Sequence, residues 1–159
     1  MFDKILKKIT GLHCVFLFLF VLLGSAAVSE AKSGDNRVLK DVTAEEALDL
    51  IEMNADNNDF VILDVRTPDE FKEGHLDNAE NIDYYTGLKR NEDVKKFNPE
   101  AFKEEVQNLD KNKIYLIYCS SGNRSEKSLK IMDEMGFTEV YNMLGGFKDW
   151  SSKGLPFVR

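Results

Sequence analysis

The chain has 159 residues, a length that fits one domain of ordinary size. Hydrophobic residues make up 43% of it and charged residues 31%, proportions that suit a globular protein and exclude collagen-like, coiled-coil and disordered chains. The formal net charge of −7 argues against a nucleic acid or an anionic membrane surface as partner.

The first 31 residues form a pattern of their own. Three lysines within the first eight residues precede an apolar run from Cys14 to Leu23, and small residues follow that run. This is the pattern of a secretory signal peptide, and the run falls short of the ~20 residues that cross a bilayer. We therefore expect cleavage after Ala31, or alternatively after Ala27, and an exported protein that is periplasmic or secreted. An uncleaved segment would instead tether the protein to the membrane.

Cleavage after Ala31 would remove Cys14 and leave Cys119 as the one cysteine of the mature chain. A single cysteine cannot form an intrachain disulfide, so in an oxidising compartment its thiol is expected to be either buried or chemically active. Residues 32–36 are expected to form a flexible linker, and residues 37–159 the folded domain.

The first half of this domain begins with a predicted strand over 38–42. Thr43 and Glu46 then form a capping-box pattern at the start of a helix that continues through Ile51. The run from Phe60 to Val65 is nearly all apolar, as expected of a strand buried on both faces of a parallel sheet. Next come a second capping box at Thr67 and Glu70, a helical turn ending before Gly74, a brief strand over 79–82 and a surface segment over 84–98.

The second half continues the alternation of helices and strands. Its predicted elements are a helix over 99–109, a strand over 114–118, a helix over 125–135, a strand over 139–143, a turn at Gly145 and Gly146, and a helix over 147–152 that places Trp150 in the core. Alternating strands and helices predict the α/β class, with a mainly parallel sheet flanked by helices.

Cys119 directly follows the strand over 114–118, at the edge where open parallel sheets place their chemistry. A loop between a strand and a helix can turn several backbone N–H groups inward and bind an anion. The candidate cradle for the sulfur and its substrate consists of Ser120, Ser121, Gly122, Asn123, Arg124 and Ser125. Such surroundings lower the pKa of a thiol and would stabilise a persulfide, which makes Cys119 the candidate nucleophile. The alternative is an inert thiol buried at a strand end.

Three segments of the chain resemble the signatures of the rhodanese family. The stretch from Asp64 to Ile82 is similar to the first family signature, Cys119 to Ser125 resembles the active-site loop, and Leu144 to Trp150 resembles the C-terminal signature. The resemblance implies a five-stranded, mainly parallel sheet flanked by helices. It also implies that Cys119 carries sulfur as a persulfide, within a cradle formed by residues 120–125, and that no metal or organic cofactor is needed.

Asp64, Arg66 and His75 match family positions that are mainly structural. The residues themselves agree with that role, because Asp64 ends a buried strand where it can accept backbone hydrogen bonds, and Arg66 can pair with a nearby acid such as Glu70. His75 follows a glycine in a turn, where a histidine is more often a hydrogen-bonded structural residue than a general base.

The resemblance implies a sulfurtransferase that moves a sulfane sulfur from thiosulfate or a persulfide to a thiol or cyanide. The partners would be a small anionic donor and a thiol acceptor, which can belong to a protein. A non-catalytic module that binds a partner or senses sulfur or redox state is the alternative.

Phosphatases and arsenate reductases of related fold have five residues between cysteine and arginine, whereas four separate Cys119 from Arg124. Ser120 and Ser121 occupy positions that are often basic in thiosulfate-specific members, which argues against thiosulfate as the natural donor unless Arg124 substitutes for the missing basic residue.

Overall fold

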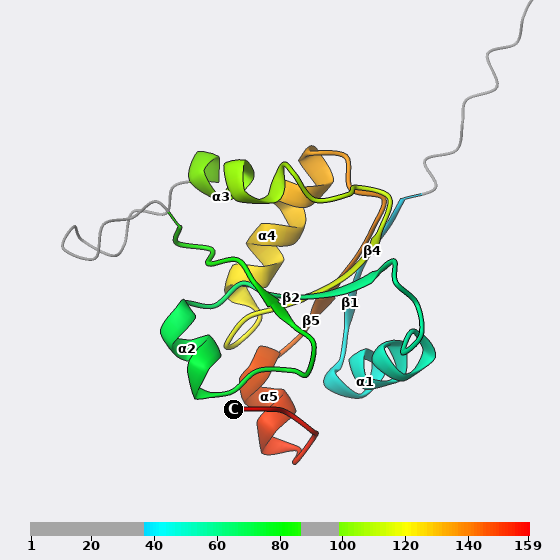
Figure 1. Ribbon diagram of the computed structural model, residues 1–159, viewed down its shortest axis with the longest axis vertical. Helices are drawn as coiled ribbons and strands as arrows, with labels where there is room; N and C mark the ends of the chain where they lie inside the picture. The colour runs from blue at the N-terminus through cyan, green and yellow to red at the C-terminus, as the bar shows by residue number, and fades with distance from the viewer. Residues whose placement is uncertain (1–36, 87–98) are drawn as a thin grey trace, which may run out of the picture. The chain divides into compact units, whose positions relative to one another are not determined.

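The computed structural model describes residues 37–86 and 99–159 (Figure 1). Its strands are β1 (Val38–Val42), β2 (Phe60–Asp64), β3 (Glu80–Asn81), β4 (Ile114–Tyr118) and β5 (Glu139–Met143). Its helices are α1 (Ala44–Met53), α2 (Pro68–Glu73), α3 (Pro99–Val106), α4 (Asn123–Glu134) and α5 (Gly146–Ser152). The expected signal peptide, the expected linker and most of the surface segment predicted over 84–98 lie outside the described residues.

The five strands form one parallel sheet of order β1-β5-β4-β2-β3, which confirms the predicted α/β class. β4 lies between β5 and β2, and its last residue, Tyr118, is in register with Asp64, the last residue of β2. Because the two strands end at the same level, the segments that follow them leave the same edge of the sheet side by side. Cys119 is the first residue after β4 at that edge.

The side chains of β4 alternate between the two faces of the sheet. Tyr115 and Ile117 belong to one core cluster together with residues of α3 and α4. Leu116 and Tyr118 belong to a second cluster, which α1 and α5 complete, and Trp150 of α5 is buried there as expected. Helices therefore cover both faces, which explains why the inner strands β2 and β4 are apolar almost throughout. Within the described ranges, no helix combines the length and the apolar character needed to cross a bilayer.

Both predicted capping boxes are present. Thr43 Oγ1 accepts the Glu46 amide at 3.2 Å while Glu46 accepts the Thr43 amide at 2.8 Å, and Thr67 and Glu70 exchange the same two bonds. The start of α4 differs from the prediction, because the helix begins at Asn123 rather than near Ser125. Gly122 has a φ of +95°, which turns the chain into the helix directly and shortens the loop.

Candidate active site

The sulfur of Cys119 lies inside the loop that follows β4. The residue is 1% exposed, and its Sγ accepts a hydrogen bond from the Gly122 amide at 3.2 Å. Ser125 Oγ lies 3.6 Å from Sγ and 3.0 Å from the Gly122 carbonyl oxygen, so its single proton can serve either acceptor. The structure thus brings Cys119 together with Gly122 and Ser125, as the sequence predicted.

These donors favour the thiolate form of Cys119. Burial by itself raises the pKa of the thiol, because it disfavours the charged form. Hydrogen bonds from the backbone amides of Ser125 and Ser121 and from the Ser125 hydroxyl outweigh burial, so the pKa of Cys119 lies below its ordinary value. A thiolate is the nucleophilic form of cysteine, and this environment therefore suits covalent chemistry.

The first residues of α5 hold the loop that follows β4 in place through backbone hydrogen bonds. The amide of Phe147 donates to the carbonyl oxygen of Cys119 at 2.7 Å, and the amide of Lys148 donates to that of Ser120 at 3.1 Å. A Cβ atom at Gly146 would lie only 2.2 Å from the Cys119 carbonyl oxygen, so any larger residue would push the loop away. The two carbonyls are thereby held toward α5, which leaves amides of the loop free to face the sulfur. The sequence marked this glycine only as part of a turn.

Arg124 is paired with Glu70, a partner that the sequence had not assigned to it. Both terminal nitrogens of Arg124 lie 2.7 Å from the two carboxylate oxygens of Glu70. Burial raises the pKa of Glu70, but Arg124 and the Thr67 amide more than offset it and hold that pKa at about 2. Burial likewise lowers the pKa of Arg124, yet the ion pair raises it overall. The ring of Tyr85 lies 5.7 Å from the guanidinium.

The expected pairing of Arg66 with Glu70 is wrong. Arg66 instead pairs with Asp64, through Nε at 2.9 Å and Nη2 at 2.6 Å from Oδ2, and it donates to the carbonyl oxygen of Gly74 at 2.6 Å. Both members of the pair are buried, and the guanidinium lies 4.2 Å from the centre of the Phe147 ring. The reason is geometric: Arg66 turns back under the end of β2, whereas Glu70 turns toward the Thr67 cap and Arg124. As predicted, Asp64 also accepts a backbone amide, that of Arg66.

His75 is held by structural contacts. Its Nδ1 lies 2.9 Å from the carbonyl oxygen of Phe71, and its ring stacks on the Phe71 ring with the centroids 3.7 Å apart. The His75 backbone pairs with that of Val158 in an isolated antiparallel bridge. These contacts agree with the structural role expected for it.

The remaining loop residues differ in exposure. Ser121 and Asn123 are exposed and Ser120 is half-buried, so these polar groups lie where an incoming molecule can reach them. In residues 37–86 and 99–159, no three His, Cys, Asp or Glu side chains are grouped closely enough to hold a metal ion.

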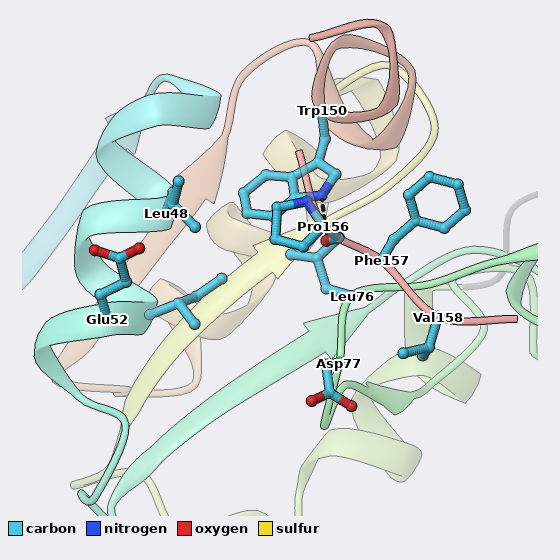
Figure 2. Close-up of a pocket in the computed structure, with 9 residues that line it drawn as sticks. Leu48, Glu52, Leu76, Asp77, Trp150, Pro156, Phe157 and Val158 are labelled. Carbon is cyan, nitrogen blue, oxygen red and sulfur yellow. Dashed lines mark hydrogen bonds between the residues drawn. The ribbon is translucent and has the colours of Figure 1, made fainter. Parts of the chain in front are cut away.

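A separate apolar groove lies on the α1 and α5 side of the sheet (Figure 2). Its volume is about 370 Å³, and its lining includes Leu48 and the C-terminal segment from Pro156 to Val158. Trp150 Nε1 donates to the carbonyl oxygen of Pro156 at 2.9 Å, which holds this segment against α5. None of the residues from 119 to 125 lines the groove.

Comparison with known proteins identifies the family to which this fold and this cysteine loop correspond. The model of the Rhodanese-like domain family matches residues 43–153. The chain is 30% identical over 113 residues to the thiosulfate sulfurtransferase GlpE of Coxiella burnetii, a match that covers 71% of this chain and 88% of that one. It is 34% identical over 94 residues to the chloroplastic thiosulfate sulfurtransferase 16 of Arabidopsis thaliana, with 59% of this chain and 76% of that one covered.

Solved structures show the same fold. A rhodanese-like domain protein from Staphylococcus aureus is 26% identical with a TM-score of 0.54, and the match covers 76% of this chain and 99% of that one. A rhodanese-related protein from Thermoplasma volcanium, 24% identical, has a TM-score of 0.55 with 75% and 97% covered. With the five-stranded parallel sheet, the cysteine loop and a family match that spans more than half of its length, the chain belongs to the rhodanese-like domain family.

Proposed function

We propose that this protein is a sulfurtransferase in which Cys119 carries a sulfane sulfur as a persulfide. The observation that carries the proposal is the position of the Cys119 sulfur, which accepts the Gly122 amide at 3.2 Å with Ser125 Oγ 3.6 Å away. Hydrogen bonds from the Ser125 and Ser121 amides and from the Ser125 hydroxyl outweigh burial and lower the pKa of the thiol, which favours the nucleophilic thiolate form. In a persulfide anion on Cys119, the terminal sulfur would carry the same negative charge as the thiolate and would lie within reach of these donors.

The reaction follows a ping-pong course. The Cys119 thiolate attacks the outer sulfur of thiosulfate, the sulfur–sulfur bond of the donor breaks, and its electron pair leaves with sulfite. With a persulfide donor, the leaving group is the donor's thiolate and the proton of the terminal sulfur stays with that sulfur. In the second half, an acceptor thiolate or cyanide attacks the outer sulfur of the Cys119 persulfide, and Cys119 leaves as a thiolate, ready for the next donor.

The length of the loop supports transfer of a single atom. Four residues separate Cys119 from Arg124, and the last of them already belongs to α4. A ring of this size leaves less room than the longer loops that enclose a tetrahedral oxyanion. The side chain of Arg124, which a phosphatase would aim at its substrate, is instead paired with Glu70.

We also propose that the protein acts outside the cytoplasm. The support for this is the basic start, the apolar run over 14–23 and the small residues before position 32. N-terminal sequencing of protein recovered from an extracytoplasmic fraction tests it, with residue 32 expected first. A chain that keeps residue 1 and stays with the membrane would indicate an anchor instead.

Intact-mass spectrometry before and after exposure to a donor tests the proposed chemistry. The wild type is expected to gain about 32 Da, one sulfur atom, which cyanide then removes, while Cys119→Ser gains nothing. A gain with a persulfide alone would identify the donor class. No gain with thiosulfate or any persulfide would contradict the proposal and favour a binding or sensing module. In such a module, the Cys119→Ser substitution should leave the binding of the partner intact.

A further inference from the structure

We infer that Glu70 determines the donor preference of this site, by cancelling the charge of Arg124 and so selecting persulfide donors over the dianion thiosulfate. The inference rests on the proposed sulfurtransferase function and adds to it the substrate class and the residue that sets it. Glu70 does not contact the reacting sulfur, and we therefore treat it as a residue that acts through Arg124.

Arg124 is the one lysine or arginine between Cys119 and Ser125. It stands in the first turn of α4, and its side chain is only 14% exposed. Both of its terminal nitrogens are bonded to Glu70 at 2.7 Å, so one N–H of each is taken by that carboxylate and the charge that would attract the sulfite end of thiosulfate is offset. The pKa of about 2 keeps Glu70 ionised at every physiological pH, and the pair therefore stays neutral as a unit.

A second carboxylate lies in the same neighbourhood. Asp83 is half-buried and accepts the amide of Tyr85, whose ring lies against Arg124. Burial raises the pKa of Asp83, and the charges of Arg124 and Glu70 act on it in opposite directions, which places all three groups within electrostatic reach of one another. Glu70 alone offsets the charge of the guanidinium, and Asp83 adds a further carboxyl group nearby, so this side of the cradle offers no net positive charge to an anionic donor.

The two donor classes respond differently to such surroundings. Thiosulfate is a dianion whose sulfite end keeps its negative charge as the sulfur–sulfur bond breaks, and surroundings without net positive charge leave that charge uncompensated. A persulfide needs only its terminal sulfur in the cradle, and its leaving group has no sulfite end to hold. The backbone amides around Cys119 serve the transferred sulfur equally well in both cases. The difference between the donors therefore depends on the charge beside the loop, which Glu70 sets.

Glu70→Gln is a clean test because it removes the charge and keeps the fold. The Oε2 atom of Glu70 accepts the Thr67 amide at 3.1 Å in the capping box of α2, and glutamine serves that position as well as glutamate does. Glu73→Gln is the matched control, since it removes the same charge from an exposed position on the same helix. Adding Arg124→Gln to Glu70→Gln shows whether the effect passes through the guanidinium.

The experiment measures single-turnover sulfur loading of the full chain by intact mass, with thiosulfate and with cysteine persulfide as donors. Glu70→Gln is expected to raise the thiosulfate-to-persulfide ratio of loading rates roughly three- to tenfold, and added salt should reduce the gain. Glu73→Gln should leave the ratio unchanged, and Arg124→Gln should abolish the gain.

An unchanged or lower ratio in Glu70→Gln would overturn the inference while leaving the sulfurtransferase function in place. An equal gain in Glu73→Gln would also overturn it, because the effect would then reflect net charge alone. If the wild type loads no sulfur from either donor, the proposed function itself fails, and that result is distinct from the other two.

Discussion

The amide of Phe147 donates to the carbonyl oxygen of Cys119 at 2.7 Å, so the first turn of α5 fixes the peptide group of the candidate nucleophile. Gly146 makes this approach possible, because a Cβ atom there would lie 2.2 Å from the same oxygen and 2.8 Å from the Ser120 carbonyl carbon. The orientation of the sulfur cradle thus depends on a glycine almost thirty residues further along the chain.

Gly146→Ala is expected to lower the rate of sulfur loading at least ~100-fold, because it displaces the loop that orients the Cys119 sulfur. It should also cost about 2–3 kcal/mol of stability, from the clash and from a φ of +59°. Single-turnover loading and urea denaturation measure the two effects. Gly154→Ala is the control, since its φ is +71° but nothing lies within 4 Å of its Cβ position. Equal rates for the two variants would contradict this account of the loop.

Ser125→Ala is expected to raise the pKa of Cys119, because it removes a hydrogen-bond donor to the thiolate. The pH dependence of alkylation by iodoacetamide reports this pKa, and the curve should move to higher pH. Ser128→Ala provides the comparison, since Ser128 lies on the same helix and its hydroxyl bonds the Arg124 carbonyl oxygen at 3.0 Å. Coincident curves for Ser125→Ala and the wild type would show that the backbone amides alone stabilise the thiolate.

Glu70 is expected to make stability depend on pH in the acid range. Its pKa falls from the ordinary 4.5 to about 2 in the folded chain, so the ion pair with Arg124 stabilises the fold above pH 4.5. That contribution is lost as the pH falls from 4.5 to about 2. Because Glu70 is partly exposed, we expect about 1–2 kcal/mol between the wild type and Glu70→Gln at pH 7. Urea denaturation of both proteins from pH 7 to pH 3 checks this, and a gap that does not narrow would refute it.

Asp64→Asn is expected to destabilise the fold by about 3–5 kcal/mol, because it leaves the buried guanidinium of Arg66 without its counter-charge. Thermal and urea denaturation measure the loss. Glu126→Gln removes one partner of the exposed pair with Lys130 on α4 and should have no measurable effect. A tolerated Asp64→Asn would mean that the carbonyl oxygen of Gly74 and the ring of Phe147 suffice to hold Arg66.

Local signals in the sequence predicted most of the fold. Capping boxes and apolar runs placed every described helix and strand to within three residues, because caps and hydrophobic periodicity act over a few neighbouring residues. The position of Cys119 followed in turn from the end of its strand. Glu70 shows the limit: its spacing from Thr67 marks it as a cap, which it is, but its pairing with Arg124 joins residues 54 positions apart.

That pairing depends on the order of the strands in the sheet. Glu70 and Arg124 meet because β2 and β4 are neighbours and end in register. The spacing of residues along the chain does not contain this order. Arg66 was assigned the wrong acid for another reason, since its partner Asp64 lies only two residues before it. Arg66 and Arg124 have different acidic partners because their side chains point in different directions at the strand ends. Residue type alone does not reveal this difference.

The strand order has a consequence for how the protein is made. β1 is the first strand in the chain, yet it pairs with β5, the last, and both β1 and β4 need β5 beside them. During synthesis the sheet therefore cannot be completed until residues 139–143 have left the ribosome. Before then β2, β3 and β4 can pair with one another, but β1 has no partner strand. Such a domain folds late and from distant contacts, which lengthens the time for which a chaperone can hold it unfolded.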